Sequence, residues 1–148
     1  MQVWTNESLW LPISAAIAVQ LYKFLYEWIR RRDFDLRVLV RSGGMPSSHS
    51  AMVSSLVSAV GHRSGTNSDV FALSVIFAVI VMYDAAGVRQ AAGKQAKVLN
   101  QIIRELFMGR PISEGELKEL IGHTSMEVIV GALIGVVYAF FWFALFTQ

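Results

Sequence analysis

The stretch VIVGALIGVVYAFFWFALF, residues 128–146, carries no charged side chain and is long enough to cross the hydrocarbon core of a bilayer as one helix. Two further stretches, at residues 9–29 and 70–88, are also long and apolar enough to span. Of the 148 residues, 54% are hydrophobic and only 16% are charged, a balance too apolar for an ordinary soluble domain. We therefore predict one membrane-embedded domain over residues 1–148, folded as an all-α bundle of about four spans.

A shorter apolar segment at residues 46–60 is the fourth predicted span, and it differs from the others in its small polar residues. Six of its side chains are serines: Ser47, Ser48, Ser50, Ser54, Ser55 and Ser58. Because lipid offers hydroxyl groups no partners, we expect this helix inside the bundle, where serines bond to neighbouring helices or to their own backbone. For Ser54, Ser55 and Ser58, close packing is the expected role.

Basic residues concentrate in two of the three connections between these spans. Five arginines follow the first span and six lysines or arginines follow the third, whereas Arg63 is the one basic residue between the second and third. The positive-inside rule then places both basic connections in the cytoplasm and both chain ends outside. Because arginines follow the first apolar stretch instead of preceding it, we expect a retained span and not a signal peptide. This orientation and anionic lipid headgroups account for the net charge of +2, so we expect no nucleic-acid partner.

Three features lie outside these spans or concern their packing. Residues 89–107 continue as an amphipathic helix that we expect to rest on lipid or on the bundle, with Gly93, Ala96 and Asn100 on one face. The pair Gly131-x-x-x-Gly135 matches the small-residue motif that brings membrane helices close together, and it leaves a homodimer open. Residues 61–69 read as an external turn-rich loop, so His62 is expected to be a solvated loop histidine.

The polar segment RSGGMPSSHS, residues 41–50, opens the second span. Glycines let backbone N–H groups approach a ligand, Pro46 suits the first position of a helix, and a helix N-terminus attracts anions. We therefore expect this segment to bind phosphate oxygens. The residues assigned to that role within it are Arg41, Gly44, Ser47 and Ser48, with His49 beside the same anion.

A second polar segment, GHTSME at residues 122–127, opens the last span. His123 and Glu127 are four residues apart, so they share a face if the helix already includes His123. The carboxylate could then hold the imidazole tautomer and stabilise the imidazolium. The alternative is a capping box between Thr124 and Glu127, in which the carboxylate only satisfies backbone donors at the helix start.

The predicted topology places all of these groups on one side of the membrane. The pairs are Arg41 with His49, Asp84 with Arg89, and His123 with Glu127, each at the cytoplasmic end of a different span. Ionisable residues at membrane depth are costly and usually functional, so we expect three helix ends to enclose one anionic headgroup. Asp84 either supports this site or forms a structural ion pair with Arg89 or Lys94.

Two of these segments resemble a known superfamily. Pro46-Ser47-Ser48-His49 is similar to the PSGH signature of the type 2 phosphatidic acid phosphatase (PAP2) superfamily, which also holds the vanadium-dependent haloperoxidases, and His123-x-x-x-Glu127 resembles its HxxxD element. Residues 83–89 and 93–96 look like the small divergent branch of that superfamily. The resemblance runs from about residue 41 to residue 135.

The resemblance implies a phosphatase that needs no metal or other cofactor. By this resemblance His123 is the nucleophile, Glu127 its support and His49 the general acid, while Arg41 and Arg89, with Lys94 nearby, hold the phosphoryl oxygens. Bidentate arginine contacts and a helix mouth can supply the charge stabilisation that magnesium supplies in other phosphatases. The substrate implied is a lipid phosphate, and the predicted topology places its hydrolysis on the cytoplasmic side of what we expect to be a bacterial plasma membrane.

This chain also departs from the superfamily pattern. Ser48 replaces the signature glycine, Glu127 replaces the aspartate, and the usual lysine-to-arginine-proline element has no clean counterpart. These departures keep a second hypothesis open, a non-catalytic protein that binds or transports a lipid phosphate. Haloperoxidase-like oxidation is disfavoured, because the chain is small and membrane-embedded.

Overall fold

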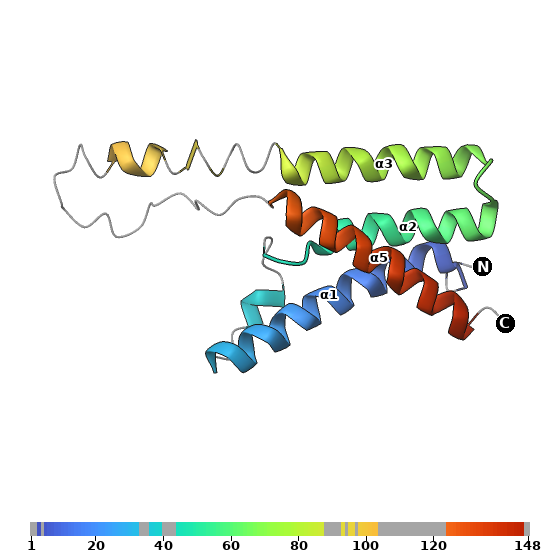
Figure 1. The fold of residues 1–148 in the computed structure, drawn as a ribbon, viewed down its shortest axis with the longest axis horizontal. Helices are drawn as coiled ribbons and strands as arrows, with labels where there is room; N and C mark the ends of the chain where they lie inside the picture. Colours follow the sequence, from blue (N-terminus) through green and yellow to red (C-terminus); the bar gives the residue numbers. More distant parts are fainter. Residues whose placement is uncertain are drawn as a thin grey trace.

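The computed structural model describes residues 3, 5–32, 36–39, 44–87, 93, 95–96, 98–103 and 124–146, and its regular elements are all helical. The long helices are α1 (Glu7–Arg31), α2 (Ser48–Ser64), α3 (Asp69–Ala86) and α5 (Ser125–Phe146), and a short 3-10 helix, η1 (Leu36–Leu39), follows α1 (Figure 1). The predicted all-α membrane bundle is confirmed.

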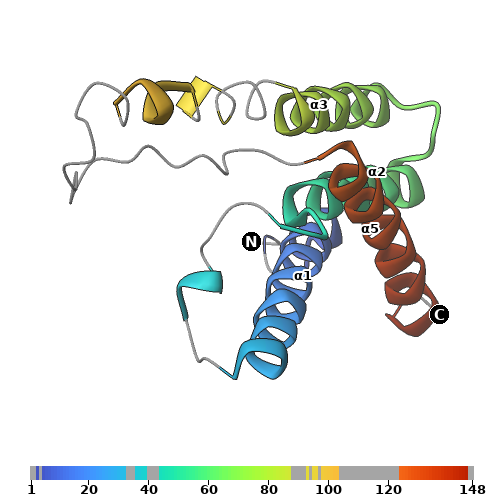
Figure 2. The same ribbon diagram turned by 60° about the vertical axis from the view of Figure 1, so that its left-hand side comes forward.

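The serine-rich helix α2 is the centre of the bundle. It contacts α1, α3 and α5, and Figure 2 shows α1 and α5 diverging from it in different directions. The Ser54 hydroxyl donates to the Ala132 carbonyl of α5 at 2.9 Å, which bonds the two helices directly. The hydroxyls of Ser55 and Ser58 donate to carbonyls of α2 itself, at 2.9 and 3.0 Å. Ser54 and Ser55 are buried, in agreement with the predicted packing role, and Ser58 is half-buried.

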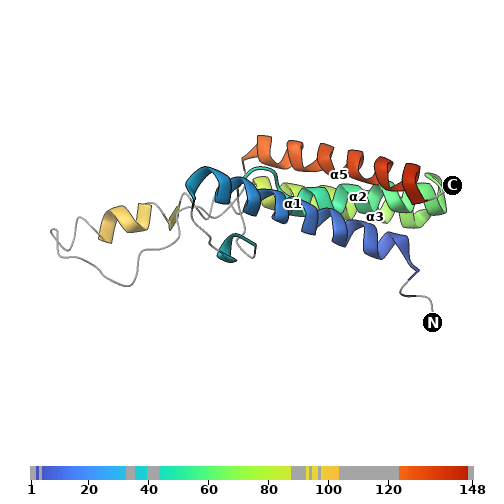
Figure 3. The ribbon, with the colours of Figure 1, turned by 90° about the horizontal axis from the view of Figure 1, so that it is seen from below.

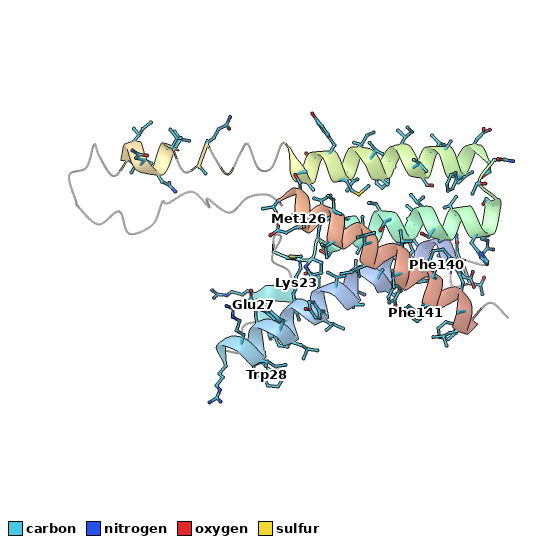
Figure 4. All side chains as sticks on the ribbon, viewed as in Figure 1. Lys23, Glu27, Trp28, Met126, Phe140 and Phe141 are labelled. Carbon is cyan, nitrogen blue, oxygen red and sulfur yellow. The ribbon has the colours of Figure 1, made fainter. Side chains whose placement is uncertain are left out.

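Three helices among the described residues are long and apolar enough to cross a membrane: Glu7–Arg30, Asp69–Ala86 and Ser125–Phe146. Their outer surfaces are apolar, as at Phe140 and Phe141 of α5, which are both exposed (Figure 4). The chain is therefore an integral membrane protein. With 17 residues, α2 is not among these three helices, so the fourth crossing remains a prediction.

Successive long helices run in opposite directions, so four helix ends point toward the same end of the bundle. At this end α1 and α3 finish and α2 and α5 begin, while the N- and C-termini lie at the opposite end (Figures 1 and 3). The start of α2, the end of α3 and the start of α5 therefore lie at the same end of the bundle, while their placement on one side of a membrane remains a prediction. The end where α2 and α5 begin is called the polar end below.

The described part of the predicted amphipathic segment 89–107 is helical, at residues 93, 95–96 and 98–103. Its side chains divide into two groups. Ala96 and Asn100 are buried, whereas Val98, Leu99 and Ile102 are exposed. This division matches the predicted amphipathic pattern, and contact of the apolar face with lipid remains a prediction.

Candidate functional site

The start of α2 is held by a serine cap. Ser47 is the N-cap, and its hydroxyl accepts the N–H of Ser50 at 3.3 Å. The prediction that Pro46 takes the first helical position is therefore wrong, because the Ser47 side chain satisfies a backbone donor and starts the helix two residues later. Before it, Gly44 has a φ of 79°, the left-handed conformation that favours glycine in a turn.

The start of α5 is held by the capping box that the sequence left open. The Thr124 N–H donates to Glu127 Oε2 at 2.9 Å, and the Glu127 N–H donates to Thr124 Oγ1 at 3.3 Å. One oxygen of the carboxylate therefore serves the helix start. His123 lies outside the described residues, so its predicted support by Glu127 remains a prediction.

These two helix starts are bonded to each other. The Ser47 N–H donates to the Glu127 carbonyl oxygen at 3.1 Å, which joins the two polar segments across 80 residues of chain. Ser47 thus donates its N–H to α5 and accepts a hydrogen bond from α2 with its hydroxyl oxygen.

Two glycines of α5 make this approach possible. A β-carbon added to Gly131 would overlap the Ser47 carbonyl oxygen, and one added to Gly135 would overlap the Ala51 carbonyl oxygen and the Ser54 hydroxyl. The prediction that the Gly131-x-x-x-Gly135 motif brings another helix close is confirmed, and the partner is α2 of the same chain. Both glycines are buried there, so the predicted homodimer would need a different surface.

The remaining predicted site residues divide into two groups. Gly44, Ser47, Ser48, His49, Asp84 and Glu127 all lie at the polar end, Ser47 and Ser48 buried and His49 exposed. Asp84 is half-buried in the last turn of α3. Arg41, Arg89, Lys94 and His123 lie outside the described residues, so neither the predicted basic clamp nor the ion pair of Asp84 is tested.

Ser50 provides a further polar group near the start of α2, and the sequence alone does not distinguish it from the other five serines of this segment. Its hydroxyl lies in the first turn of α2, is fully buried, and has no hydrogen-bond partner among the residues described. A buried polar group without a partner costs about 1–3 kcal/mol, so a polar ligand that reached it would recover part of that cost.

Lys23 is a residue of this end that the sequence analysis missed. It lies on α1 and is only 7% exposed. Figure 4 labels Lys23 on α1 and Met126 at the start of α5. The available signal was a lysine within an apolar span, since an ionisable group at membrane depth is a functional candidate in its own right.

Aromatic residues mark the depth of this end in the membrane. Tyr22, Tyr26 and Trp28 are exposed on α1, on both sides of Lys23 in the sequence. The Arg30 guanidinium lies 6.0 Å from the centre of the Tyr26 ring and donates to its hydroxyl at 3.3 Å. Tyrosine and tryptophan concentrate where the hydrocarbon meets the headgroups, so these side chains favour a position of the polar end near headgroup level.

His62 lies away from these residues. It belongs to the last turn of α2, at the opposite end of that helix from His49, and its ring stacks on Phe143 at 4.1 Å. The prediction of a loop histidine is wrong, because α2 continues to Ser64 and ends at Gly65, which shortens the predicted loop to residues 65–68.

Comparison with known proteins indicates a family for this sequence. A family model described as the divergent PAP2 family matches residues 4–138, a range that includes both polar segments. A protein named "Uncharacterized membrane protein YuiD", from Bacillus subtilis (strain 168), is 39% identical over 149 residues, which cover 92% of this chain and 93% of the relative. No solved structure matches the chain. On the strength of the family match and this relative, the chain belongs to the divergent PAP2 family.

Proposed function

We propose that this protein is a membrane lipid-phosphate phosphatase whose site lies at the polar end of the bundle. The observation that carries the proposal is the hydrogen bond from the Ser47 N–H to the Glu127 carbonyl oxygen, because it joins the two segments that resemble the PAP2 signature elements. Membership of the divergent PAP2 family supports phosphoryl chemistry as the activity. The buried Ser50 hydroxyl adds a polar group beside the same helix start.

The proposed reaction has two steps. An imidazole nitrogen of His123 attacks the terminal phosphorus, its bond to the leaving oxygen breaks, and His49 gives its proton to that oxygen, which departs with a lipid alcohol from a monoester or with a lipid monophosphate from a diphosphate. Water then attacks the phosphohistidine, His49 takes a proton from that water, and inorganic phosphate leaves. The N–H groups at the start of α2 and the arginines of the neighbouring segments stabilise the charge on the phosphoryl oxygens.

The substrate class follows from the position of the polar end. Aromatic residues at headgroup level support a substrate whose phosphate lies in the interface and whose chains remain in the bilayer. Phosphatidate, phosphatidylglycerophosphate and polyprenyl diphosphate all have this form. We place the reaction on the cytoplasmic leaflet of a bacterial plasma membrane, because the basic connections adjoin this end.

The test is phosphate release from vesicles that contain one lipid phosphate at a time, in EDTA, with the purified protein. We expect release by the wild type, inhibition by vanadate, a fall in kcat of about 10²-fold or more in His49→Ala, and no turnover in His123→Ala. His62→Phe is the matched control, since it changes a histidine at the other end of α2 and keeps a ring against Phe143. Full activity in both site variants would refute the assigned roles.

The second hypothesis, a non-catalytic protein that binds or transports lipid phosphate, is favoured by one observation. The Glu127 carboxylate accepts the Thr124 N–H, so part of its hydrogen-bonding capacity serves the helix start. This hypothesis expects headgroup binding or transfer between leaflets with no phosphate release from any lipid in the panel. The same vesicle assay, combined with a binding measurement, separates the two.

A further inference from the structure

Ser50 differs from five other serines of the described helices in the hydrogen bonding of its hydroxyl. Within a helix, a serine hydroxyl commonly donates to a backbone carbonyl three or four residues earlier. The serines that do so in α1, α2 and α3 are Ser14, Ser54, Ser55, Ser58 and Ser74. The Ser50 hydroxyl is fully buried and has no hydrogen-bond partner among the residues described.

The position of Ser50 in the first turn of α2 accounts for this difference. The carbonyl four residues before it belongs to Pro46, which lies outside the helix. The carbonyl three residues before it belongs to the N-cap, Ser47, and accepts the Ala51 N–H at 3.1 Å. The Ser50 N–H itself donates to the Ser47 hydroxyl at 3.3 Å. The cap therefore fixes the backbone of Ser50 and leaves its hydroxyl without a partner in α2.

The side chain of Ser50 is directed toward the polar end. In an α-helix each Cα–Cβ bond tilts toward the N-terminus, so this side chain leans toward the start of α2. The first N–H groups of a helix point the same way, and in a helix of 17 residues they carry a positive partial charge. A hydroxyl that leans toward such a helix start is oriented to donate to an anion bound there.

The surroundings of Ser50 leave one side of the helix start open. Ser50 lies three positions after Ser47 and four before Ser54, which both bond to α5, so it shares the face of α2 that α5 covers. The turn before α2 is exposed at Gly44 and Met45. No described atom lies within 4 Å of the point where a β-carbon of Gly44 would be. This turn is thus the route by which an oxyanion reaches the first turn of α2.

We propose that Ser50 is a phosphate ligand, whose hydroxyl donates to an oxygen of a phosphoryl group bound at the start of α2. The sequence assigned such a role to Ser47, but Ser47 accepts the Ser50 N–H with its hydroxyl oxygen and gives its own N–H to α5. The ligand is a tetrahedral oxyanion, either the headgroup of a lipid phosphate or inorganic phosphate. The role of Ser50 in turnover rests on the proposed function, whereas phosphate binding does not.

Titration of the full chain with inorganic phosphate, followed by its Tm in detergent, tests the assignment without requiring any activity. Because hydrogen bonds to charged groups are the stronger ones, Ser50→Ala should raise the Kd for phosphate about tenfold or more. Ser55→Ala is the matched control, since Ser55 is also fully buried on α2 but donates to the Met52 carbonyl. We expect the control to lower Tm and to keep the Kd of the wild type. A Kd in Ser50→Ala that rises no more than in Ser55→Ala would overturn the proposal.

A second titration with a short-chain phosphatidate, and with the matching diacylglycerol as its blank, distinguishes the two sources of phosphate. Since the hydroxyl contacts the phosphoryl group that both ligands share, Ser50→Ala should weaken both by a similar factor. Ser50→Cys keeps the size of the side chain and a weak donor, so its affinities should lie between those of Ser50→Ala and the wild type. A loss for the lipid alone, or no phosphate binding by the wild type in either titration, would overturn the proposal.

The same two titrations separate this proposal from the proposed function. If the wild type binds both ligands through Ser50 but releases phosphate from no lipid, the proposed function fails and the ligand assignment stands. If the wild type hydrolyses a lipid phosphate and Ser50→Ala binds phosphate as tightly as the wild type, the assignment of Ser50 fails alone.

Discussion

Gly131 of α5 lies so close to Ser47 of α2 that a β-carbon on Gly131 would overlap the Ser47 carbonyl oxygen. In most exposed helix positions, alanine in place of glycine stabilises a helix by about 1 kcal/mol. At Gly131 we expect the opposite sign, because the methyl group must push α5 away from the N-cap of α2. The distance between the two polar segments therefore depends on the absence of one side chain.

The first prediction is that Gly131→Ala lowers the free energy of unfolding by about 1–3 kcal/mol and reduces phosphate release. Leu133→Ala is the control, since Leu133 lies two residues away on α5 and is 61% exposed on the outer face. Thermal unfolding in detergent measures both variants. A Gly131→Ala protein as stable as the wild type would contradict the close contact with Ser47.

The second prediction concerns the bond between Ser54 and α5. Ser54→Ala removes a hydroxyl that donates to the Ala132 carbonyl, so we expect a loss of about 0.6–1.7 kcal/mol. Ser58→Ala removes a hydroxyl that bonds only within α2, at the Ser54 carbonyl, and should cost less. Equal losses in the two variants, measured by unfolding in the same detergent, would show that the bond between helices adds nothing.

The third prediction concerns the buried hydroxyl of Ser50. Because the described structure gives this hydroxyl no partner, Ser50→Ala removes an unsatisfied group and should leave Tm unchanged or raise it. If the hydroxyl contacts the bound phosphate, the same variant should weaken inhibition by vanadate. A clear fall in Tm without vanadate would contradict the account of Ser50.

The fourth prediction separates the two roles of Glu127. Thr124→Ala breaks the capping box and keeps the carboxylate, so we expect a cost of about 1 kcal/mol in stability with turnover largely retained. Glu127→Gln keeps the capping box and removes the negative charge. Compared with Thr124→Ala, we expect this variant to lose less stability from the cap and to lose more kcat. The reverse order of effects on kcat would favour a purely structural role for Glu127.

The fold could be predicted from the sequence largely because its spans are set by apolar length. The stretches 9–29, 70–88 and 128–146 differ by three residues or fewer from the ends of α1, α3 and α5. The buried position of α2 could also be predicted, because lipid cannot satisfy the hydroxyl groups of its serines.

The details of the site were harder to predict, because they depend on contacts between helices. The hydrogen bond from Ser47 to Glu127 joins residues 80 positions apart, and no local pattern encodes it. Lys23 lies in the first span, outside the signature-like segments, and its burial depends on how α1 packs against the other helices. The fixed φ of Pro46 predicts a helix start there, but the capping hydroxyl of Ser47 starts the helix at Ser48.

The most direct test of the central claim is to trap the phosphorylated enzyme, by rapid quenching after brief exposure to a lipid labelled in its phosphate. We predict label on the wild type and on His62→Phe, bound through an acid-labile linkage, and none on His123→Ala. Label on His123→Ala equal to that on the wild type, or phosphate release with no labelled protein at any time, would contradict attack by the histidine that precedes α5 on a phosphate held at the start of α2.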